Sequence, residues 1–263
     1  MSGGLKGKWA LILGASSGFG ASTARALARA GMHIIGVHLD RRATLPAVEE
    51  LVKDIQAQGV QAAFFNVNAA DPEKRKEILD QVQPKLGGPI TVIMHSLAFG
   101  TLKPYLTADP KDQLTKDQME MTLDVMANSL VYWTQDLVSR KLIGKGSRIY
   151  AMTSSGGTRV WPHYGAVSAA KAALESHIRQ LAMELAPYEA SANTIRAGVT
   201  DTPALRKIPG SDEMIKFATT RNPFHRLTTT EDVAQAITIL SNSGADWVTG
   251  NVIGADGGED IVG

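Results

Sequence analysis

The residues best suited to chemistry in this chain are Tyr164 and Lys171, which lie seven positions apart in the segment His163–Lys171. A lysine near a phenol lowers the phenol pKa or strengthens the hydrogen bond that the phenol donates. The position one helical turn before Lys171 is Val167, which can transfer no proton. If the intervening chain were helical, Tyr164 would lie about 4.5 Å further along the axis than Val167. The spacing therefore predicts a hydrogen-bond donor displaced along the helix from the usual position.

Such a displacement favours one kind of reduction over another. When a carbonyl group is reduced, hydride and proton go to adjacent atoms, so the phenol must lie close to the hydride donor. When an α,β-unsaturated thioester is reduced, hydride goes to Cβ and negative charge develops on the carbonyl oxygen, further along the conjugated system. Tyr164 is therefore predicted to donate to a thioester oxygen. The alternative is an aromatic ring that only packs beside Trp161 and Pro162 at the start of a helix.

A glycine-rich segment, Gly14–Gly20, follows the apolar run Trp9–Leu13 directly and leads into a helix expected over Gly20–Ala30. Glycines at such a point allow a tight turn and let backbone N–H groups and the helix N-terminus approach a pyrophosphate. Ordinary turn chemistry explains many glycine clusters. The position between the first strand and the first helix favours a dinucleotide site instead.

These groups need a scaffold, and short apolar runs that alternate with longer amphipathic stretches predict one. Strands are expected at Trp9–Leu13, His33–Val37, Gln61–Phe65, Ile90–Met94, Ser147–Met152, Ala192–Arg196 and Val252–Gly254. Helices are expected at Gly20–Ala30, Leu45–Gln58, Pro72–Gln83, Gln113–Leu142, Val167–Leu185 and Thr230–Ser241. Near-continuous apolar strands are typical of a sheet covered on both faces. The sequence predicts an α/β fold, a single-domain Rossmann-type doubly wound parallel sheet with helices on both faces, over residues 1–263.

One stretch, 202–227, has no clear periodicity and is rich in Pro and Gly. A loop of that length in a compact domain is more often a substrate lid than a defect. This stretch contains basic residues, at Arg206, Lys207, Lys216, Arg221 and Arg226. They could meet an acidic carrier protein or form an ordinary solvated surface.

Composition excludes several classes of function. The chain of 263 residues has a formal net charge of +1, which argues against nucleic-acid or membrane-surface binding. It has no cysteine, so it forms no disulfide or thiolate metal site, and its six histidines lack paired ligand spacing. No apolar run approaches the roughly 20 residues that span a bilayer. Without an apolar segment before the first strand, a cytoplasmic protein without a signal peptide is expected.

The glycine spacing Gly14-x-x-x-Gly18-x-Gly20 resembles that of the short-chain dehydrogenase/reductase family, and the resemblance covers nearly the whole chain. Asn66-Val67 is similar to the family's adenine-contacting pair, and Ser154 or Ser155 to its substrate-orienting serine. Gly198 with Thr200 and Thr202 corresponds to the family's nicotinamide-binding segment. The ending Ala255–Gly258 resembles a Val-Asp-Gly-Gly ending at an edge usually buried in a tetramer.

Within that family the spacing of Tyr164 and Lys171 is that of enoyl-acyl-carrier-protein reductases, where most members have Tyr-x-x-x-Lys. The segment His95–Ala98 also resembles that of enoyl reductases. Met126 occupies the position of the helical Asn that supports a proton-relay water in carbonyl reducers, and Asn128 is expected to point elsewhere. The glycine loop and Ser154 are instead like those of ordinary members, since many enoyl reductases have a longer loop and often a second Tyr.

The resemblance implies a set of site residues. The implied catalytic residues are Tyr164, Lys171 and Ser154. The implied cofactor-binding residues are Gly14, Ser16, Ser17, Gly18, Phe19, Gly20, His38, Arg41, Arg42, Asn66, Val67, Ser96, Leu97, Ala98, Lys171, Gly198, Thr200 and Thr202. Lys171 is expected to bind the nicotinamide ribose hydroxyls. Ser154 is expected to help hold the thioester oxygen or the phenol.

The choice of nicotinamide cofactor depends on the residues after the second strand. A carboxylate on the ribose 2′-hydroxyl selects NADH, whereas Arg or Lys selects the 2′-phosphate of NADPH. Counting from the glycine loop places His38, which is not acidic, at the family's selective position. The guanidinium groups of Arg41 and Arg42 favour NADPH, and Asp40 leaves NADH possible.

The sequence therefore predicts an NADPH-dependent reductase of trans-2-enoyl thioesters in fatty-acid synthesis. Its expected partner is an acyl-carrier protein, with no nucleic acid or membrane, and a homotetramer is expected. One alternative is a carbonyl reductase or alcohol dehydrogenase of the same family, acting on 3-oxoacyl or steroid substrates. Val167 and Met126 argue against it. A non-catalytic cofactor-binding sensor is the other alternative.

Overall fold

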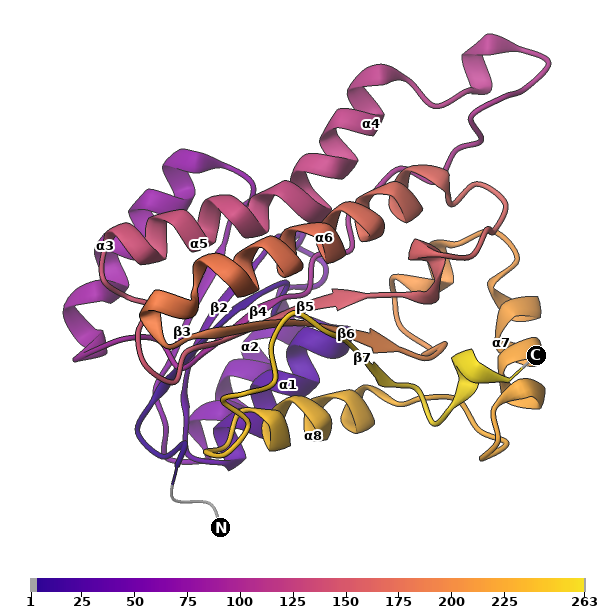
Figure 1. Cartoon of the computed structure of the whole chain (residues 1–263). Coiled ribbons are helices and arrows are strands. Elements are labelled where there is room, and N and C mark those ends of the chain that lie inside the picture. The colour runs from indigo at the N-terminus through magenta and orange to yellow at the C-terminus, as the bar shows by residue number, and fades with distance from the viewer. Residues whose placement is uncertain (1–3, 263) are drawn as a thin grey trace.

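In the computed structural model, residues 4–262 form a seven-stranded sheet in the order β3-β2-β1-β4-β5-β6-β7, in which every pair is parallel (Figure 1). Residues 1–3 and 263, which the predicted domain also includes, lie outside the described residues. The strands are β1 Trp9–Leu13, β2 His33–His38, β3 Ala62–Asn66, β4 Val92–His95, β5 Arg148–Thr153, β6 Ser191–Ala197 and β7 Val252–Ala255. The predicted doubly wound fold and its strands are confirmed, with small differences at the strand ends.

Helices cover both faces of this sheet. One layer holds α3 Pro72–Leu86, α4 Lys116–Leu123, α5 Ser129–Ser139 and α6 Gly165–Glu184, and the other holds α1 Gly18–Arg29, α2 Leu45–Gln56 and α8 Thr230–Leu240 (Figure 1). Alternate residues of β1 enter different cores: Leu11 and Leu13 pack with the first layer, and Ala10 and Ile12 with the second. This period of two explains why the strand is apolar throughout.

Local sequence determines where several helices begin. The Asp71 side chain accepts hydrogen bonds from the backbone N–H groups of Glu73 and Lys74 at the start of α3. Thr229 and Asp232 form a reciprocal capping box at the start of α8. Such caps satisfy backbone donors that have no partner within the helix.

The predicted continuous helix over Gln113–Leu142 is interrupted, which corrects the sequence interpretation. It consists of α4, a π-helical turn at Asp124–Asn128 and α5. A π turn inserts one extra residue into a helix, and such turns often lie at functional sites.

The predicted lid 202–227 is not a simple loop. It contains a 3₁₀ turn at Leu205–Lys207 and the helix α7 Ser211–Arg221. Gly210 precedes α7 with φ +77°, and Asp212 and Glu213 supply negative charge to its first turn. The Pro209-Gly210 pair reads as a turn in the sequence and concealed the helix that follows it.

The parallel sheet brings the carboxyl ends of its strands to one edge. The loops after β1, β2, β4, β5 and β6 all leave from that edge. Ligands of doubly wound folds bind at this edge, in the crevice where the strand order reverses between β1 and β4.

Candidate active site

The glycine loop after β1 lies against the segment that follows β4. A side chain at Gly14, whose φ is +87°, would collide with the backbone oxygen of Ser96. A side chain at Gly20 would collide with the backbone oxygen of Gly14. Ser96 in turn donates its N–H to Leu13. The loop is therefore closed by backbone contacts that only glycine permits.

A hollow of about 390 Å³ opens at the start of α1, bordered by Ser16, Ser17, Gly18, Arg25 and Thr202 among others. Ser17 occupies the N-cap but its side chain makes no capping hydrogen bond. The first N–H groups of α1 are therefore available to a phosphate, as the helix terminus favours. The residues present fit the pyrophosphate of a dinucleotide.

Asp40, beyond the end of β2, is the most connected polar residue beside this loop. Its carboxylate accepts from Thr44 Oγ1 at 2.8 Å and lies 2.9 Å from His38 Nδ1. The Asn66 side chain pairs with its backbone N–H and C=O at 2.8 and 3.1 Å. Burial opposes ionisation, but hydrogen bonds from Ser16, Thr44 and His38 outweigh it and lower the pKa of Asp40.

The other residues predicted to bind the cofactor near the end of β2 differ in their exposure and contacts. Arg41 and Arg42 are exposed beside Asp40, whereas His38 is buried. Val67 donates its N–H to His38 O at 2.8 Å, and Phe19 packs on the core beneath α1. The side chain of Asn66, predicted to contact adenine, is thus engaged in holding Asp40.

Tyr164 lies at the N-cap of α6, just outside the helix that carries Lys171. Its ring packs on Gly156, where a Cβ atom would clash, and its Oη lies 3.5 Å from Ser154 Oγ. Burial raises the pKa of Tyr164, and the contact with Ser154 acts in the opposite direction. A neutral phenol can donate a hydrogen bond, and donation by Tyr164 to a substrate oxygen stays a prediction.

Lys171 is 6% exposed and donates from Nζ to the backbone oxygen of Met152 at 2.7 Å. Burial lowers the pKa of Lys171 to about 8, while the negative charge of Glu175 acts in the opposite direction. One turn after Lys171, Glu175 accepts from Thr153 Oγ1 at 2.6 Å. Lys171 and Glu175, one turn apart on α6, therefore both form hydrogen bonds with the end of β5.

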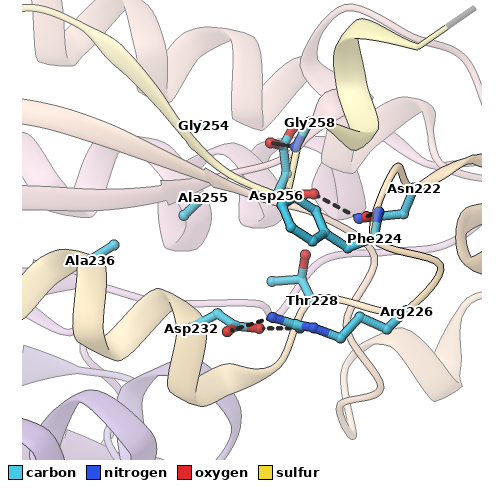
Figure 2. Close-up of a pocket in the computed structure, with 11 residues that line it drawn as sticks. Asn222, Phe224, Arg226, Thr228, Asp232, Ala236, Gly254, Ala255, Asp256 and Gly258 are labelled. Atoms are coloured by element: carbon cyan, nitrogen blue, oxygen red, sulfur yellow. Dashed lines mark hydrogen bonds and ion pairs between the residues drawn. The ribbon is translucent and has the colours of Figure 1, made fainter.

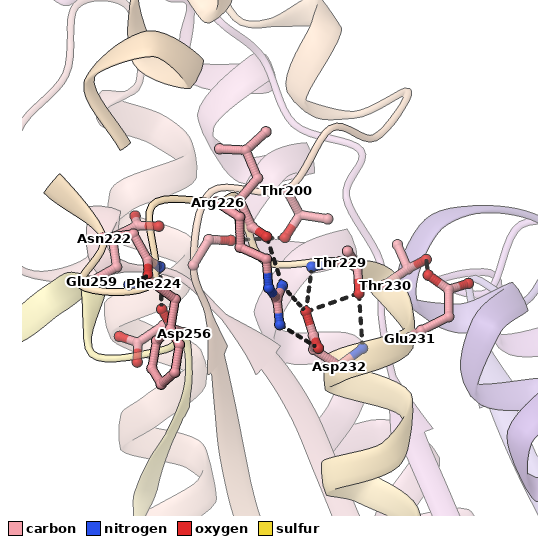
Figure 3. A network of polar contacts seen from close by, with 12 residues as sticks. Thr200, Asn222, Phe224, Arg226, Thr229, Thr230, Glu231, Asp232, Asp256 and Glu259 are labelled. Atoms are coloured by element: carbon pink, nitrogen blue, oxygen red, sulfur yellow. Dashed lines mark hydrogen bonds and ion pairs between the residues drawn. The ribbon is translucent and has the colours of Figure 1, made fainter. Parts of the chain in front are cut away.

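The segment after β6 closes the site opposite Tyr164. Gly198 is tightly enclosed, since a Cβ atom there would contact Thr228 and Glu259. The Val199 N–H donates to both carboxyl oxygens of Glu259, at 3.2 and 3.1 Å. Burial raises the pKa of Glu259. Figure 3 shows Thr200 and Glu259 within the polar network that extends towards α8.

Two further predicted threonines serve this segment from within. Thr200 Oγ1 donates to Gly198 O at 3.0 Å, and Thr202 Oγ1 accepts from the Leu205 N–H at 3.2 Å. Thr202 also places its methyl group 3.6 Å from where a Cβ atom of Gly18 would lie. The glycine loop and the segment after β6 therefore meet.

The segment after β4 contributes mainly backbone. His95 is fully buried and pairs through Nε2 with Ser129 Oγ at 2.9 Å. Leu97 packs near Gly14, and Ala98 is exposed. Asn128 points away from a relay position, as expected, because its Oδ1 lies 3.1 Å from His177 Nε2.

Three residues in these contacts, Thr153, Glu175 and Glu259, were not predicted as site residues. Glu175 could have been found from its spacing, since it lies four positions after Lys171. Glu259 gave no such signal, because 60 residues separate it from Val199. Among residues 4–262, no group of three His, Asp or Glu side chains is arranged to hold a metal ion. No helix in that range is long and apolar enough to cross a membrane.

A second hollow of about 390 Å³ lies between β7, α8 and the end of the lid (Figure 2). Its charged pair, Arg226 and Asp232, is joined by two hydrogen bonds, and the Phe224 ring is 72% exposed at its rim. Buried Asp256 accepts the N–H of Gly258 at 3.0 Å. None of the predicted site residues lines this hollow, and its charges are already paired.

The glycine loop, the parallel sheet and the tyrosine–lysine pair together define a Rossmann-type oxidoreductase of the short-chain dehydrogenase/reductase class. The model of the family described as "Enoyl-(Acyl carrier protein) reductase" matches residues 14–259, and the chain belongs to this family.

Relatives carry mixed names. An NADH-dependent enoyl-[acyl-carrier-protein] reductase of Aquifex aeolicus is 28% identical, over 98% of this chain and 93% of the relative. A 3-oxoacyl-[acyl-carrier-protein] reductase of Pseudomonas aeruginosa is 29% identical, over 97% and 98%. The crystal structure of the Aquifex aeolicus enoyl reductase covers 98% of both chains with a TM-score of 0.85 and 26% identity. The class of enzyme is established by these likenesses, and both reactions occur among the relatives.

Proposed function

We propose that this protein reduces the carbon–carbon double bond of trans-2-enoyl thioesters. The observation that carries the proposal is the exchange of positions between Tyr164 and Val167. Val167 is 5% exposed and packs in the core near Met126, so one turn before Lys171 there is only hydrocarbon. The half-buried phenol beside Ser154 belongs to Tyr164, ahead of the helix.

A bound nicotinamide would supply the hydride, held by the glycine loop, Lys171 and the segment after β6. Tyr164 would donate a hydrogen bond to the thioester oxygen and stabilise the negative charge that develops there. Ser154 would orient that phenol from the end of β5. The ammonium group of Lys171, with donors left after its bond to Met152, would bind ribose hydroxyls and strengthen the donor character of Tyr164.

For the cofactor we propose NADPH, with NADH also accepted. The exposed guanidinium groups of Arg41 and Arg42 support binding of a 2′-phosphate. The carboxylate of Asp40, hydrogen-bonded to Thr44 and with its pKa lowered, supports a ribose 2′-hydroxyl and opposes the phosphate. Because these charges act against each other, selectivity between the cofactors should be weak.

We propose an acyl-carrier protein as the carrier and a cytoplasmic homotetramer as the assembly. Much of the positive charge in and after the lid is paired, since Arg206 contacts Asp201 and Asp212. Lys207 and Lys216 are exposed and remain candidates for an acidic carrier. Exposed Trp247 and Ile239, near β7 and on α8, support an edge that is buried between subunits.

The proposal is tested by following reduced-cofactor oxidation with crotonyl thioester and, in parallel, acetoacetyl thioester. NADPH and NADH are compared in each assay. Oxidation with crotonyl and not with acetoacetyl thioester is expected. Activity with acetoacetyl thioester alone would indicate a carbonyl reductase, and tight cofactor binding without turnover would indicate a sensor.

A further inference from the structure

The ammonium group of Lys171 is held in an unfavourable place for a charge. It is 6% exposed, and among residues 4–262 its one hydrogen bond goes to the neutral backbone oxygen of Met152. Burial of a cation in such surroundings favours the neutral amine unless a negative charge compensates it. A neutral Lys171 would bind ribose hydroxyls more weakly and would no longer polarise Tyr164.

The compensating charge comes from the next turn of the same helix. Glu175 lies four residues after Lys171, a spacing at which side chains share one face. Its Oε1 is fixed by a 2.6 Å hydrogen bond from Thr153 Oγ1. Gly157 leaves room for it, since a Cβ atom there would lie 3.3 Å from Oε1. The carboxylate is therefore held at the end of β5, immediately before Ser154.

We propose that Glu175 is a positioning residue that keeps Lys171 charged and fixes the end of β5 beside the phenol. The inference rests on the proposed function only through the binding of a nicotinamide ribose to Lys171. It adds a residue that touches neither cofactor nor substrate. Thr153 is its anchor, because it fixes the carboxylate at the end of β5, beside the strand whose Met152 oxygen accepts from Lys171.

Other titratable groups on α6 and at the end of β4 do not replace this charge. His95, from β4, is fully buried, and burial followed by the charge of Lys171 lowers its pKa to about 3. His177, further along α6, has its pKa lowered by burial. Tyr164, at the start of α6, has its pKa raised by burial. All three are neutral near pH 7, which leaves Glu175 as the compensating anion among these groups.

Loss of the Glu175 charge should lower the pKa of Lys171. Glu175 opposes the effect of burial, which lowers the pKa of Lys171 to about 8. Removing the negative charge should lower the Lys171 pKa further. As pH rises, the variant should then lose the charged lysine, and with it cofactor affinity, at a lower pH than the natural protein. We take the effect of an opposite charge one helical turn away to be about one pKa unit.

The test measures the dissociation constant of NADPH, without thioester, by nicotinamide fluorescence between about pH 6 and pH 10, a range that brackets the Lys171 pKa. Glu175→Gln keeps an oxygen for Thr153 and removes only the charge. Its alkaline midpoint should move down by about one pH unit. Thr153→Val, the matched control, removes the hydrogen bond and keeps the charge, so its midpoint should move less. Glu175→Asp keeps the negative charge, so its midpoint should lie close to that of the natural protein.

Glu175→Met provides a second neutral variant if Glu175→Gln does not fold. An unchanged midpoint in a folded neutral variant would overturn the inference. A shifted midpoint would support it even if the enzyme failed to reduce crotonyl thioester, because no thioester enters the measurement. The failure of the proposed function and the failure of the role of Glu175 therefore give different results.

Discussion

The adenosine side and the catalytic side of the site differ in the exposure of their charged groups. Around the glycine loop, Asp40 contacts His38 and Thr44 within a few residues of sequence, and Asn66 joins it from the end of β3, 26 positions away. On the catalytic side, Glu175 reaches Thr153 and Glu259 reaches Val199, across 22 and 60 positions. The first side has exposed charges at its rim. The second has a buried lysine with a half-buried carboxylate one turn away.

This difference indicates where each property of the site is encoded. A phosphate loop works through backbone geometry, so a short glycine motif is enough to specify it. A buried acid–base pair works through its surroundings, so distant residues decide its protonation. Variants of the two sides should accordingly fail in different ways.

The largest effect is expected on the catalytic side, in Tyr164→Phe. Loss of the hydrogen bond to the developing oxyanion should lower enoyl turnover by about 10²–10⁴-fold. Cofactor affinity should stay nearly unchanged, because the phenol is not among the cofactor-binding residues. Steady-state kinetics with crotonyl thioester and a fluorescence titration measure the two quantities. Full turnover in this variant would remove Tyr164 from the mechanism.

On the adenosine side, Gly14→Ala should damage cofactor binding and stability together. The added methyl group meets the Ser96 backbone oxygen at φ +87°, and overpacking of this kind costs about 1–3 kcal/mol. The matched control is Gly59→Ala, with φ +77° and nothing within 4 Å of the added atom. Thermal unfolding with and without NADPH compares them. Equal losses in both variants would mean that backbone strain, and not closure of the loop, matters at Gly14.

A smaller change is expected from Asp40→Asn. Removing the carboxylate should raise kcat/KM for NADPH by about tenfold, which corresponds to about 1.4 kcal/mol. It should lower kcat/KM for NADH. Steady-state kinetics with both cofactors provides the measurement, and Arg41→Ala should move the ratio in the opposite direction. An unchanged cofactor ratio in Asp40→Asn would show that Asp40 has no part in selection.

The smallest effect is expected from Glu259→Ala, which leaves the Val199 N–H without its acceptor. One hydrogen bond is worth about 1 kcal/mol, so KM for the cofactor should rise about fivefold. Glu259→Gln retains an acceptor oxygen and should behave nearly like the natural protein. If Ala and Gln variants bind the cofactor equally well, this contact does not hold the segment after β6.

The distance along the chain between contacting residues explains what could be predicted from the sequence. The strands were predictable because both faces of the sheet are covered, which makes strands such as β1 apolar throughout. The glycine loop and the Tyr164–Lys171 spacing were predictable because each is a local pattern. The π turn at Asp124–Asn128 was not, since this segment contains no Gly or Pro to mark a change in the helix.

Residues that act through space were harder to predict. Asp40 was recognised only as an argument for NADH, because its contacts with Asn66 depend on how the ends of β2 and β3 meet. Glu259 required knowledge of where the chain turns after β7. The roles of Thr153 and Glu175 depend on how α6 packs against β5.

The central claim is that the displaced phenol directs hydride to Cβ of an enoyl thioester. Its most direct test offers the enzyme an equal mixture of crotonyl and acetoacetyl thioesters with NADPH deuterated at the transferred position. Mass spectrometry then locates the deuterium. The account predicts butyryl thioester labelled at Cβ and no labelled 3-hydroxybutyryl product. Label found only in 3-hydroxybutyryl thioester would contradict it and make this protein a carbonyl reductase.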